Sequence, residues 1–239
     1  VAAEIEEIAI ENNTLSFQDY LDCRKMSLVI NIFYNEGIFE EIVKVLENIG
    51  ISPFSWLEKI YDNTDVDKFN SLVSQYIDES TNELWESKSD LEVFANNVEN
   101  IKKYISGEYG NNLLAKYKAL SLTEYFDSVC EIAAIAIEDI IDDHGYQDRE
   151  ILDLTSEIIK FKRLRVSHIF DMSFKEYEFK FKYNVGSDLL RLSESVDSDF
   201  NHKKVMYKSP KLLKFKFSDT QKSMIKSYSN LFGSDLAGL

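Results

Sequence analysis

The spacing of apolar residues changes near residue 166, and this change constrains the fold more than any other feature of the chain. Before it, apolar residues recur at the helical spacing of roughly 3.6, whereas after it they alternate with charged residues as in a β-strand. Only eight glycines and two prolines occur in 239 residues, which favours long helices with few tight turns. We therefore expect an α+β, predominantly α fold, in which a multi-helical assembly precedes a small antiparallel β-sheet and a C-terminal helix.

The charge follows the same division of the chain. Residues 1–165 carry 33 acidic and 15 basic side chains, a net charge of −18, whereas residues 166–239 carry 9 acidic and 12 basic side chains, a net charge of +3. We expect an acidic helical region over 1–165 and a small β-sheet with a terminal helix over 166–239, packed together as one accessory unit. Binding to a phosphate backbone needs Lys and Arg, so we expect no nucleic-acid partner.

The acidic region contains the signals of successive helices. Ser16 is a suitable N-cap, with Asp19 at the spacing of a capping box. This predicts a helix over 16–33, which should form an antiparallel hairpin with a second helix over 38–49. Apolar spacing and turn residues predict further helices at 53–62, 65–87, 90–106, 111–119, 121–143 and 147–164.

The remaining segment contains two candidate strands. Aromatic and charged residues alternate over 177–183, and 211–218 repeats the pattern, which is typical of half-buried antiparallel strands. A short strand at 189–192 and a last helix at 220–232 complete this region. Aromatic side chains between lysines also occur on surfaces that stack nucleic-acid bases. A sheet that faces a core needs the same pattern, and the acidic charge of the chain favours this second interpretation.

Two cysteines, Cys23 and Cys130, lie in apolar helical contexts, which favours a reducing compartment, and we expect a cytoplasmic protein. Trp56 and Trp85 are expected to lie half-buried in the helical core. No apolar run is long enough to cross a bilayer, so no membrane association is expected. The chain begins VAAEIEE, within an amphipathic segment, as expected of a fragment of a longer polypeptide, although removal of Met before Val gives the same start.

One acidic run is a candidate metal site. Glu138 and Asp142, like Asp139 and Asp143, lie four residues apart and therefore side by side on a helix, and His144 follows them. A carboxylate-bridged metal pair would also need Glu-x-x-His pairs on facing helices, and the sequence has none. A solvated helix end accounts for the run better than a metal site does.

Residues 19–42 resemble the region just after the catalytic barrel of cobalamin-binding radical S-adenosylmethionine (SAM) proteins. The tail resembles the end of such proteins through the strand at 177–183 and the sequence KFKFSDTQKSMIKSYSNLFG at 214–233. The features of the first segment that match are Tyr20, Arg24, the apolar run 28–33, and Phe33-Tyr34-Asn35 leading into Gly37-Ile38-Phe39.

The resemblance implies a parent enzyme with a cobalamin domain and a barrel that binds SAM and a 4Fe-4S cluster. CxxxCxxC motifs hold such clusters and DxHxxG motifs ligate cobalamin, and this chain has neither. Nor does it contain GxSxG, P-loop or GxGxxG motifs, so no catalytic or cofactor-binding residue is assigned. The resemblance thus implies a non-catalytic C-terminal accessory region of a B12-binding radical SAM enzyme. Such a region would pack beside the barrel or gate it, with the N-terminal domains of the same polypeptide as partners.

The alternative is a free-standing acidic helical module that recruits a basic protein through its negative surface. A start codon just before Val1 would favour this alternative, whereas a long upstream reading frame would favour the accessory region.

Overall fold

The computed structural model describes residues 6–106, 109–110, 112–145, 149–166, 176–185, 205–219 and 222–223. Within these residues the chain forms nine α-helices, one π-helix and a two-stranded antiparallel sheet, which confirms the predominantly α, α+β class. The strand expected at 189–192 lies outside the described residues, as does almost all of the helix expected at 220–232. The elements are α1 (Phe17–Ile30), the π-helix η1 (Asn31–Asn35), α2 (Glu40–Asn48), α3 (Pro53–Asp62), α4 (Asp67–Asn82), α5 (Lys88–Ala95), α6 (Val98–Ser106), α7 (Leu113–Leu122), α8 (Phe126–Asp143), α9 (Arg149–Val166), β1 (Tyr177–Tyr183) and β2 (Met206–Phe215).

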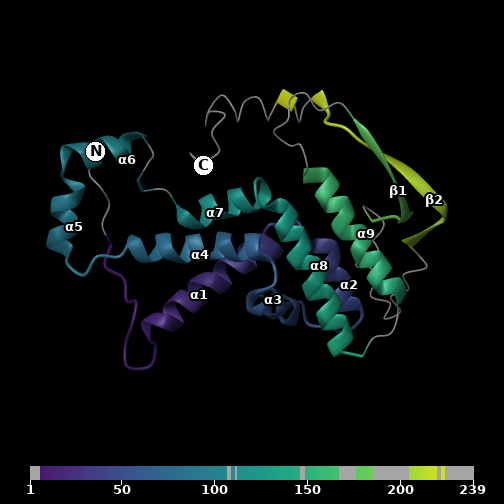
Figure 1. Cartoon of the computed structure of the whole chain (residues 1–239), viewed down its shortest axis with the longest axis horizontal. Helices are drawn as coiled ribbons and strands as arrows, with labels where there is room; N and C mark the ends of the chain where they lie inside the picture. Colours follow the sequence, from purple (N-terminus) through teal and green to yellow (C-terminus); the bar gives the residue numbers. More distant parts are fainter. Residues whose placement is uncertain are drawn as a thin grey trace.

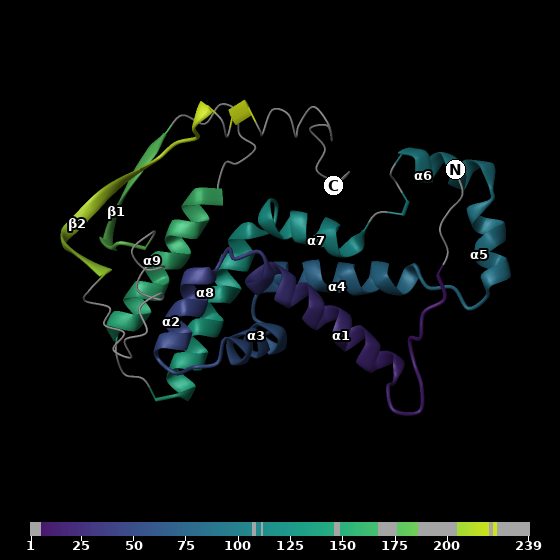
Figure 2. The same ribbon diagram turned by 180° about the vertical axis from the view of Figure 1, so that it is seen from behind.

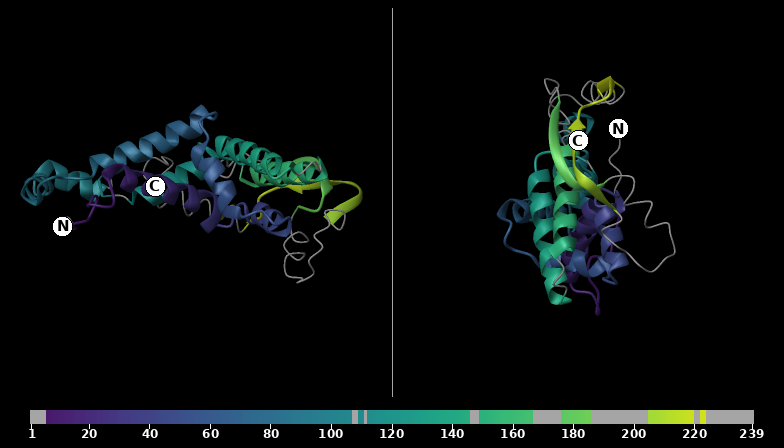
Figure 3. Two further views of the ribbon diagram at one scale, coloured as in Figure 1. Left: turned by 90° about the horizontal axis from the view of Figure 1, so that it is seen from below. Right: turned by 90° about the vertical axis from the view of Figure 1, so that its right-hand side faces the viewer.

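These elements are spread along the longest axis of the molecule, but not in chain order (Figure 1). Helices α5 and α6 lie at one end, α1, α4 and α7 lie in the middle, and α8, α9 and the sheet lie at the other end. Seen from behind, α2 lies in front of α8 and α9, and α3 lies beside α1 (Figure 2). The side view in Figure 3 shows the same elongated shape, with α5 and the sheet at opposite extremes. No described helix combines the length and apolar character needed to cross a bilayer.

A cluster of aromatic rings forms the centre of the core. Phe33 of η1 contacts Phe39, Trp56 and Phe69 at centroid distances of 5.6, 5.8 and 5.8 Å, and none of the four residues is more than 1% exposed. The indole N–H of Trp56 donates to the carbonyl oxygen of Ala133 in α8 at 3.3 Å. Trp56 is therefore fully buried rather than half-buried, because its single polar atom has a partner in the neighbouring helix.

The capping box expected at the start of α1 is confirmed. The hydroxyl of Ser16 accepts the N–H of Asp19 at 3.1 Å, and the Asp19 carboxylate accepts the N–H of Ser16 at 2.8 Å. The hydrogen bonds from the Ser16 side chain and backbone lower the pKa of Asp19 below its ordinary value. These contacts satisfy N–H groups that a helix start otherwise leaves without partners.

Replacing Ser16 by alanine should lower the free energy of unfolding by about 1 kcal/mol at neutral pH, because the N-cap acceptor is lost. A carboxyl whose pKa is lowered by folding stabilises the fold only when ionised, so the difference between wild type and Ser16→Ala should shrink as the pH falls through the pKa of Asp19. Urea denaturation followed by circular dichroism measures both effects. Ser74→Ala, at an exposed position inside α4, is the control and should change the free energy of unfolding by less than about 0.5 kcal/mol. Equal costs of the two substitutions would contradict the capping role.

Helices α1 and α2 do not form the expected antiparallel hairpin. Helix α1 packs mainly against α3 and α4, whereas α2 packs mainly against α3 and α9. The π-helix η1 extends α1, and Gly37 then turns the chain with a φ of 65°, a left-handed conformation that favours glycine. This turn brings Phe33 and Phe39 together in the core and leaves α2 beside α9 (Figure 2).

The single helix expected over 90–106 is two helices, α5 and α6. The side-chain amide of Asn96 donates to the carbonyl oxygen of Glu92 at 2.8 Å at the end of α5. The side-chain oxygen of Asn97 then accepts the N–H of Glu99 at 2.9 Å at the start of α6. Asparagine side chains that bond the local backbone compete with a continuous helix, which explains the break.

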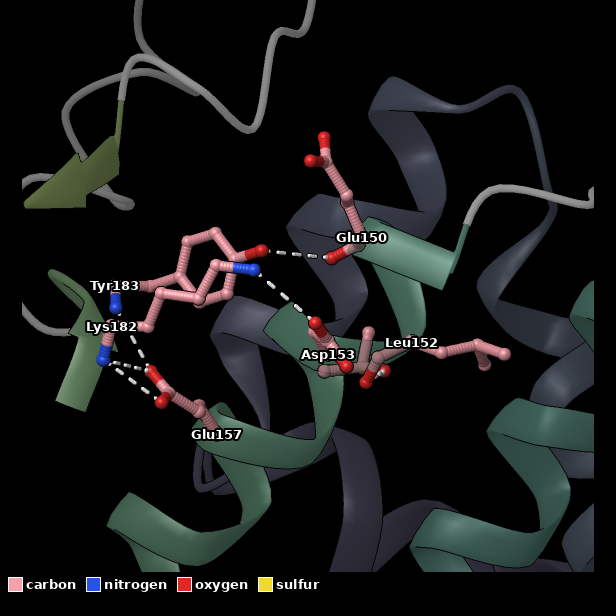
Figure 4. Close-up of polar contacts among 7 residues, drawn as sticks. Glu150, Leu152, Asp153, Glu157, Lys182 and Tyr183 are labelled. Carbon is pink, nitrogen blue, oxygen red and sulfur yellow. Dashed lines mark hydrogen bonds and ion pairs between the residues drawn. The ribbon is translucent and has the colours of Figure 1, made fainter.

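A carboxylate of α9 holds the edge of the sheet (Figure 4). The two carboxylate oxygens of Glu157 accept the backbone N–H of Lys182 at 2.8 and 2.9 Å, and one of them also accepts the N–H of Tyr183 at 2.9 Å. The Lys182 ammonium lies 3.2 Å from Asp153, and the Tyr183 hydroxyl donates to the carbonyl oxygen of Glu150 at 3.3 Å. The register between β1 and β2 shifts between Phe181 and Tyr183, and Glu157 accepts backbone N–H groups at this irregularity.

The aromatic face of the sheet packs on α9. Phe181, Tyr183 and Phe215 are buried, and Phe161 of α9 contacts Phe181 and Phe215 at 5.9 and 5.6 Å between ring centroids. Phe179, on the same strand, remains 37% exposed. The alternation in the sequence therefore corresponds to a core-facing strand, as expected from its pattern.

Candidate functional site

The acidic run weighed as a metal site lies at the C-terminal end of α8. Glu138, Asp139, Asp142, Asp143 and His144 are all exposed. Asp143 forms an ion pair with Lys59 of α3 at 2.5 Å, and Nδ1 of His144 lies 2.9 Å from the carbonyl oxygen of Ile140. Within the described ranges, no three His, Cys, Asp or Glu side chains are grouped as a metal site requires.

The two cysteines lie in different environments. Cys23 is exposed on α1, whereas Cys130 is buried in α8. Burial raises the pKa of the Cys130 thiol to about 12, although Arg163 acts in the opposite direction, so this thiol stays protonated near neutral pH. Two cysteines of this kind do not fit a 4Fe-4S cluster, which needs three thiolates from one motif.

A pocket of about 580 Å³ lies between the segment before α1, α1 itself and the link from α4 to α5. Tyr20 and Arg24 of α1 form one wall of this pocket, and Ser80, Glu83 and Trp85 contribute to another. Its volume lies within the range of small-molecule sites, roughly 300–1,000 Å³. We call it the Arg24 pocket.

Arg24 is held in place by two contacts. Its Nη2 donates to the hydroxyl of Ser80 at 3.1 Å, and its guanidinium carbon lies 5.2 Å from the ring centroid of Tyr76. The Nε atom of Arg24 is buried and has no hydrogen-bond acceptor in the described part of the chain. No described carboxylate lies within ion-pair distance of this guanidinium, whereas buried or half-buried arginines are usually paired.

Glu83 is the acidic counterpart in the same pocket. Glu83 lies at an exposed position, but partial desolvation of its carboxyl in the pocket raises the pKa of Glu83, with Arg24 acting to lower it and Glu79 acting to raise it further. Burial also raises the pKa of the Tyr76 phenol beneath Arg24. Arg24 and Glu83 thus influence each other through space and line one cavity, yet they are too far apart to form an ion pair.

Part of the Arg24 pocket lies within a segment that matches a known family model. Residues 7–71 match the family model described as a protein of unknown function, DUF4080. Domains of this kind are found in B12-binding radical SAM proteins. The matched segment includes Tyr20 and Arg24, whereas Ser80, Glu83 and Trp85 lie beyond it. Neither the curated proteins nor the solved structures gave a match to the chain.

The pocket could be found only in part from the sequence. Arg24 belongs to the segment that carries the resemblance, but the sequence indicates no partner for it, and no sequence pattern marks Glu83. Ser80 lies 56 residues from Arg24, so no local spacing connects the two. Trp85 is 42% exposed and packs on Phe94 of α5 at 4.9 Å rather than in the main helical core.

Proposed function

We propose that this chain is an accessory region of a B12-binding radical SAM enzyme, which packs beside the catalytic barrel and covers part of its substrate opening. The observation that carries this proposal is the DUF4080 match over residues 7–71, because domains of this kind are found in B12-binding radical SAM proteins. The resemblance of the tail at 214–233 to the end of such proteins supports a C-terminal position.

The chemistry of the parent would then come from other domains. SAM, the 4Fe-4S cluster and cobalamin would supply the chemistry, and the N-terminal domains of the same polypeptide would hold them. The protonated, buried Cys130 and the isolated, exposed Cys23 do not provide a cluster site in this region. The contribution of this chain would therefore be a surface and a pocket.

An exposed apolar surface on α5 and α6 supports docking against another domain. Val93, Val98 and Ile105 are 75%, 66% and 65% exposed. Val98, Ile101 and Ile105 recur at helical spacing on α6, yet this helix has no buried residue among those that the structure describes. Exposed apolar surface of this kind is typical of protein contacts. We propose that the N-terminal domains of the parent cover this α5–α6 surface.

Introducing charge at the α5–α6 surface should affect the parent polypeptide but not the isolated chain. Val98→Glu combined with Ile105→Glu should change the free energy of unfolding of residues 1–239 by less than about 0.5 kcal/mol, because both side chains are exposed. In the parent polypeptide, the same two substitutions should lower the melting temperature and accelerate limited proteolysis between the domains. Lys102→Glu, on an exposed site of the same helix, is the control and should leave both measurements unchanged.

Two further tests of the proposal are the upstream reading frame and a deletion of this chain from the parent. The reading frame upstream of Val1 should encode a CxxxCxxC motif, and a start codon directly before Val1 would instead favour the free-standing acidic module. Deletion of residues 1–239 from the parent should reduce substrate turnover while the cluster, measured by its absorption, is retained. Unchanged turnover after this deletion would contradict a role at the substrate opening.

A further inference from the structure

The Arg24 pocket contains two opposite charges that form no ion pair with a described residue. Arg24 is anchored by Ser80 but forms no ion pair with any described residue. The backbone N–H of Glu83 donates to the carbonyl oxygen of Glu79, but the carboxylate of Glu83 has neither a hydrogen bond nor an ion pair with a described residue. Two opposite charges that line one cavity would gain by moving together, unless packing holds them apart. Here Arg24 is fixed between Ser80 and the ring of Tyr76, so the separation is built into the fold.

The balance of charge around the pocket argues against a simple anion as its ligand. The described lining residues include four carboxylates, from Glu6, Glu7, Glu83 and Glu86, and two cations, from Arg24 and Lys88. Lys88 lies 3.9 Å from Glu7, so the lysine is already engaged with an acidic group. A phosphate or dicarboxylate would meet an excess of negative charge, which opposes its binding.

A simple cation would gain from this negative charge, but it would satisfy only one of the two opposite charges. It would have to leave the guanidinium of Arg24 unpaired in a partly desolvated site, which is costly. A ligand with both charges satisfies the two groups together. Its anionic end can accept from Arg24, and its cationic end can pair with Glu83.

The pocket also has apolar lining residues. These are Ile8, Ile10, Leu84, Leu91 and the exposed ring of Trp85. An aliphatic or aromatic side chain on the ligand would bury surface against them, and apolar contact supplies much of the affinity of small-molecule sites. The volume of about 580 Å³ exceeds that of one amino acid and suits a peptide of a few residues.

We propose that the Arg24 pocket binds a short zwitterionic peptide, with the terminal carboxylate on Arg24, the terminal ammonium on Glu83 and an apolar side chain against Trp85. This assignment goes beyond the accessory role and does not depend on it, since every group that it uses belongs to this chain. It is tested on the chain itself.

Titration calorimetry with leucine, dileucine and trileucine tests the proposal directly. At least one of these zwitterions should bind residues 1–239, and the N-acetylated and C-amidated forms of that same probe should bind at least tenfold more weakly. Glu83→Gln and Arg24→Gln should each raise its dissociation constant at least tenfold. Glu131→Gln, at an exposed site of α8 away from the pocket, is the matched control and should leave the dissociation constant unchanged.

Each other outcome would overturn the assignment. If none of the three probes binds, the assignment of a peptide site is wrong. Equal binding of the N-acetylated form would make the site an anion site, and equal binding of the C-amidated form would make it a cation site. If Arg24→Gln lowers the circular dichroism signal, Glu83→Gln alone decides, because Glu83 lies at an exposed position and its loss should not affect folding.

Discussion

Replacing Phe33 by alanine should lower the free energy of unfolding of this chain by about 3–5 kcal/mol, the range observed when a fully buried phenylalanine is truncated. Phe33 has no exposed surface and contacts the rings of Phe39, Trp56 and Phe69. Its removal leaves a cavity among three rings that belong to three different segments, so collapse of one neighbour cannot fill it. Guanidinium denaturation followed by far-ultraviolet circular dichroism provides the measurement.

Phe54→Ala is the matched control for this prediction. Phe54 lies in α3 and is 50% exposed, so the same truncation should cost less than about 1.5 kcal/mol. If Phe33→Ala does not fold, Phe33→Leu keeps most of the apolar volume and should retain a cooperative transition at reduced denaturant concentration. Similar costs at positions 33 and 54 would show that the aromatic cluster is not the centre of the core.

Features that depend on neighbouring residues were predictable from the sequence. The Ser16–Asp19 capping box needs only a spacing of three, and α3 occupies the expected 53–62 because Pro53 is suited to the first turn of a helix. The alternation over 177–183 predicted a strand with one core-facing side, which Phe181 and Tyr183 confirm. Each of these signals is contained within a few residues, so no knowledge of the tertiary structure is required.

Features that depend on distant partners were not predictable in this way. The hairpin of α1 and α2 was expected from a short connection, but η1 and the turn at Gly37 direct α2 to α9. Full burial of Trp56 depends on a carbonyl 77 residues away, at Ala133. The pocket likewise depends on the meeting of Arg24 with Ser80. Tertiary packing selects these partners among many that local patterns allow equally well.

The same distinction applies to a buried ion pair between α2 and α9. Glu41 of α2 and Lys162 of α9 form an ion pair whose side chains are 4% and 9% exposed. Charged residues are mostly exposed, so their patterns in the sequence gave no sign that these two would be buried together. The pair joins the segment that matches DUF4080 to a helix that lies outside it and carries the sheet.

Replacing Lys162 by methionine should lower the free energy of unfolding by about 3–5 kcal/mol, because it leaves the carboxylate of Glu41 buried without a counter-charge. Lys44→Met removes a lysine from the exposed pair with Glu47 and should cost less than about 1 kcal/mol, so it controls for the loss of a lysine alone. Guanidinium denaturation of the two variants gives the comparison.

The double variant Glu41→Leu with Lys162→Met distinguishes two contributions to the free energy of unfolding: the cost of one buried charge without a partner, and the net contribution of the ion pair. Both charges are then absent, and apolar side chains of similar size occupy the contact between α2 and α9, so most of the lost stability should return. A double variant at least about 2 kcal/mol more stable than Lys162→Met would give a large coupling energy in the mutant cycle. Additive losses at the two positions would instead mean that each residue contributes through other contacts, and that the ion pair does not hold α9 and the sheet against α2.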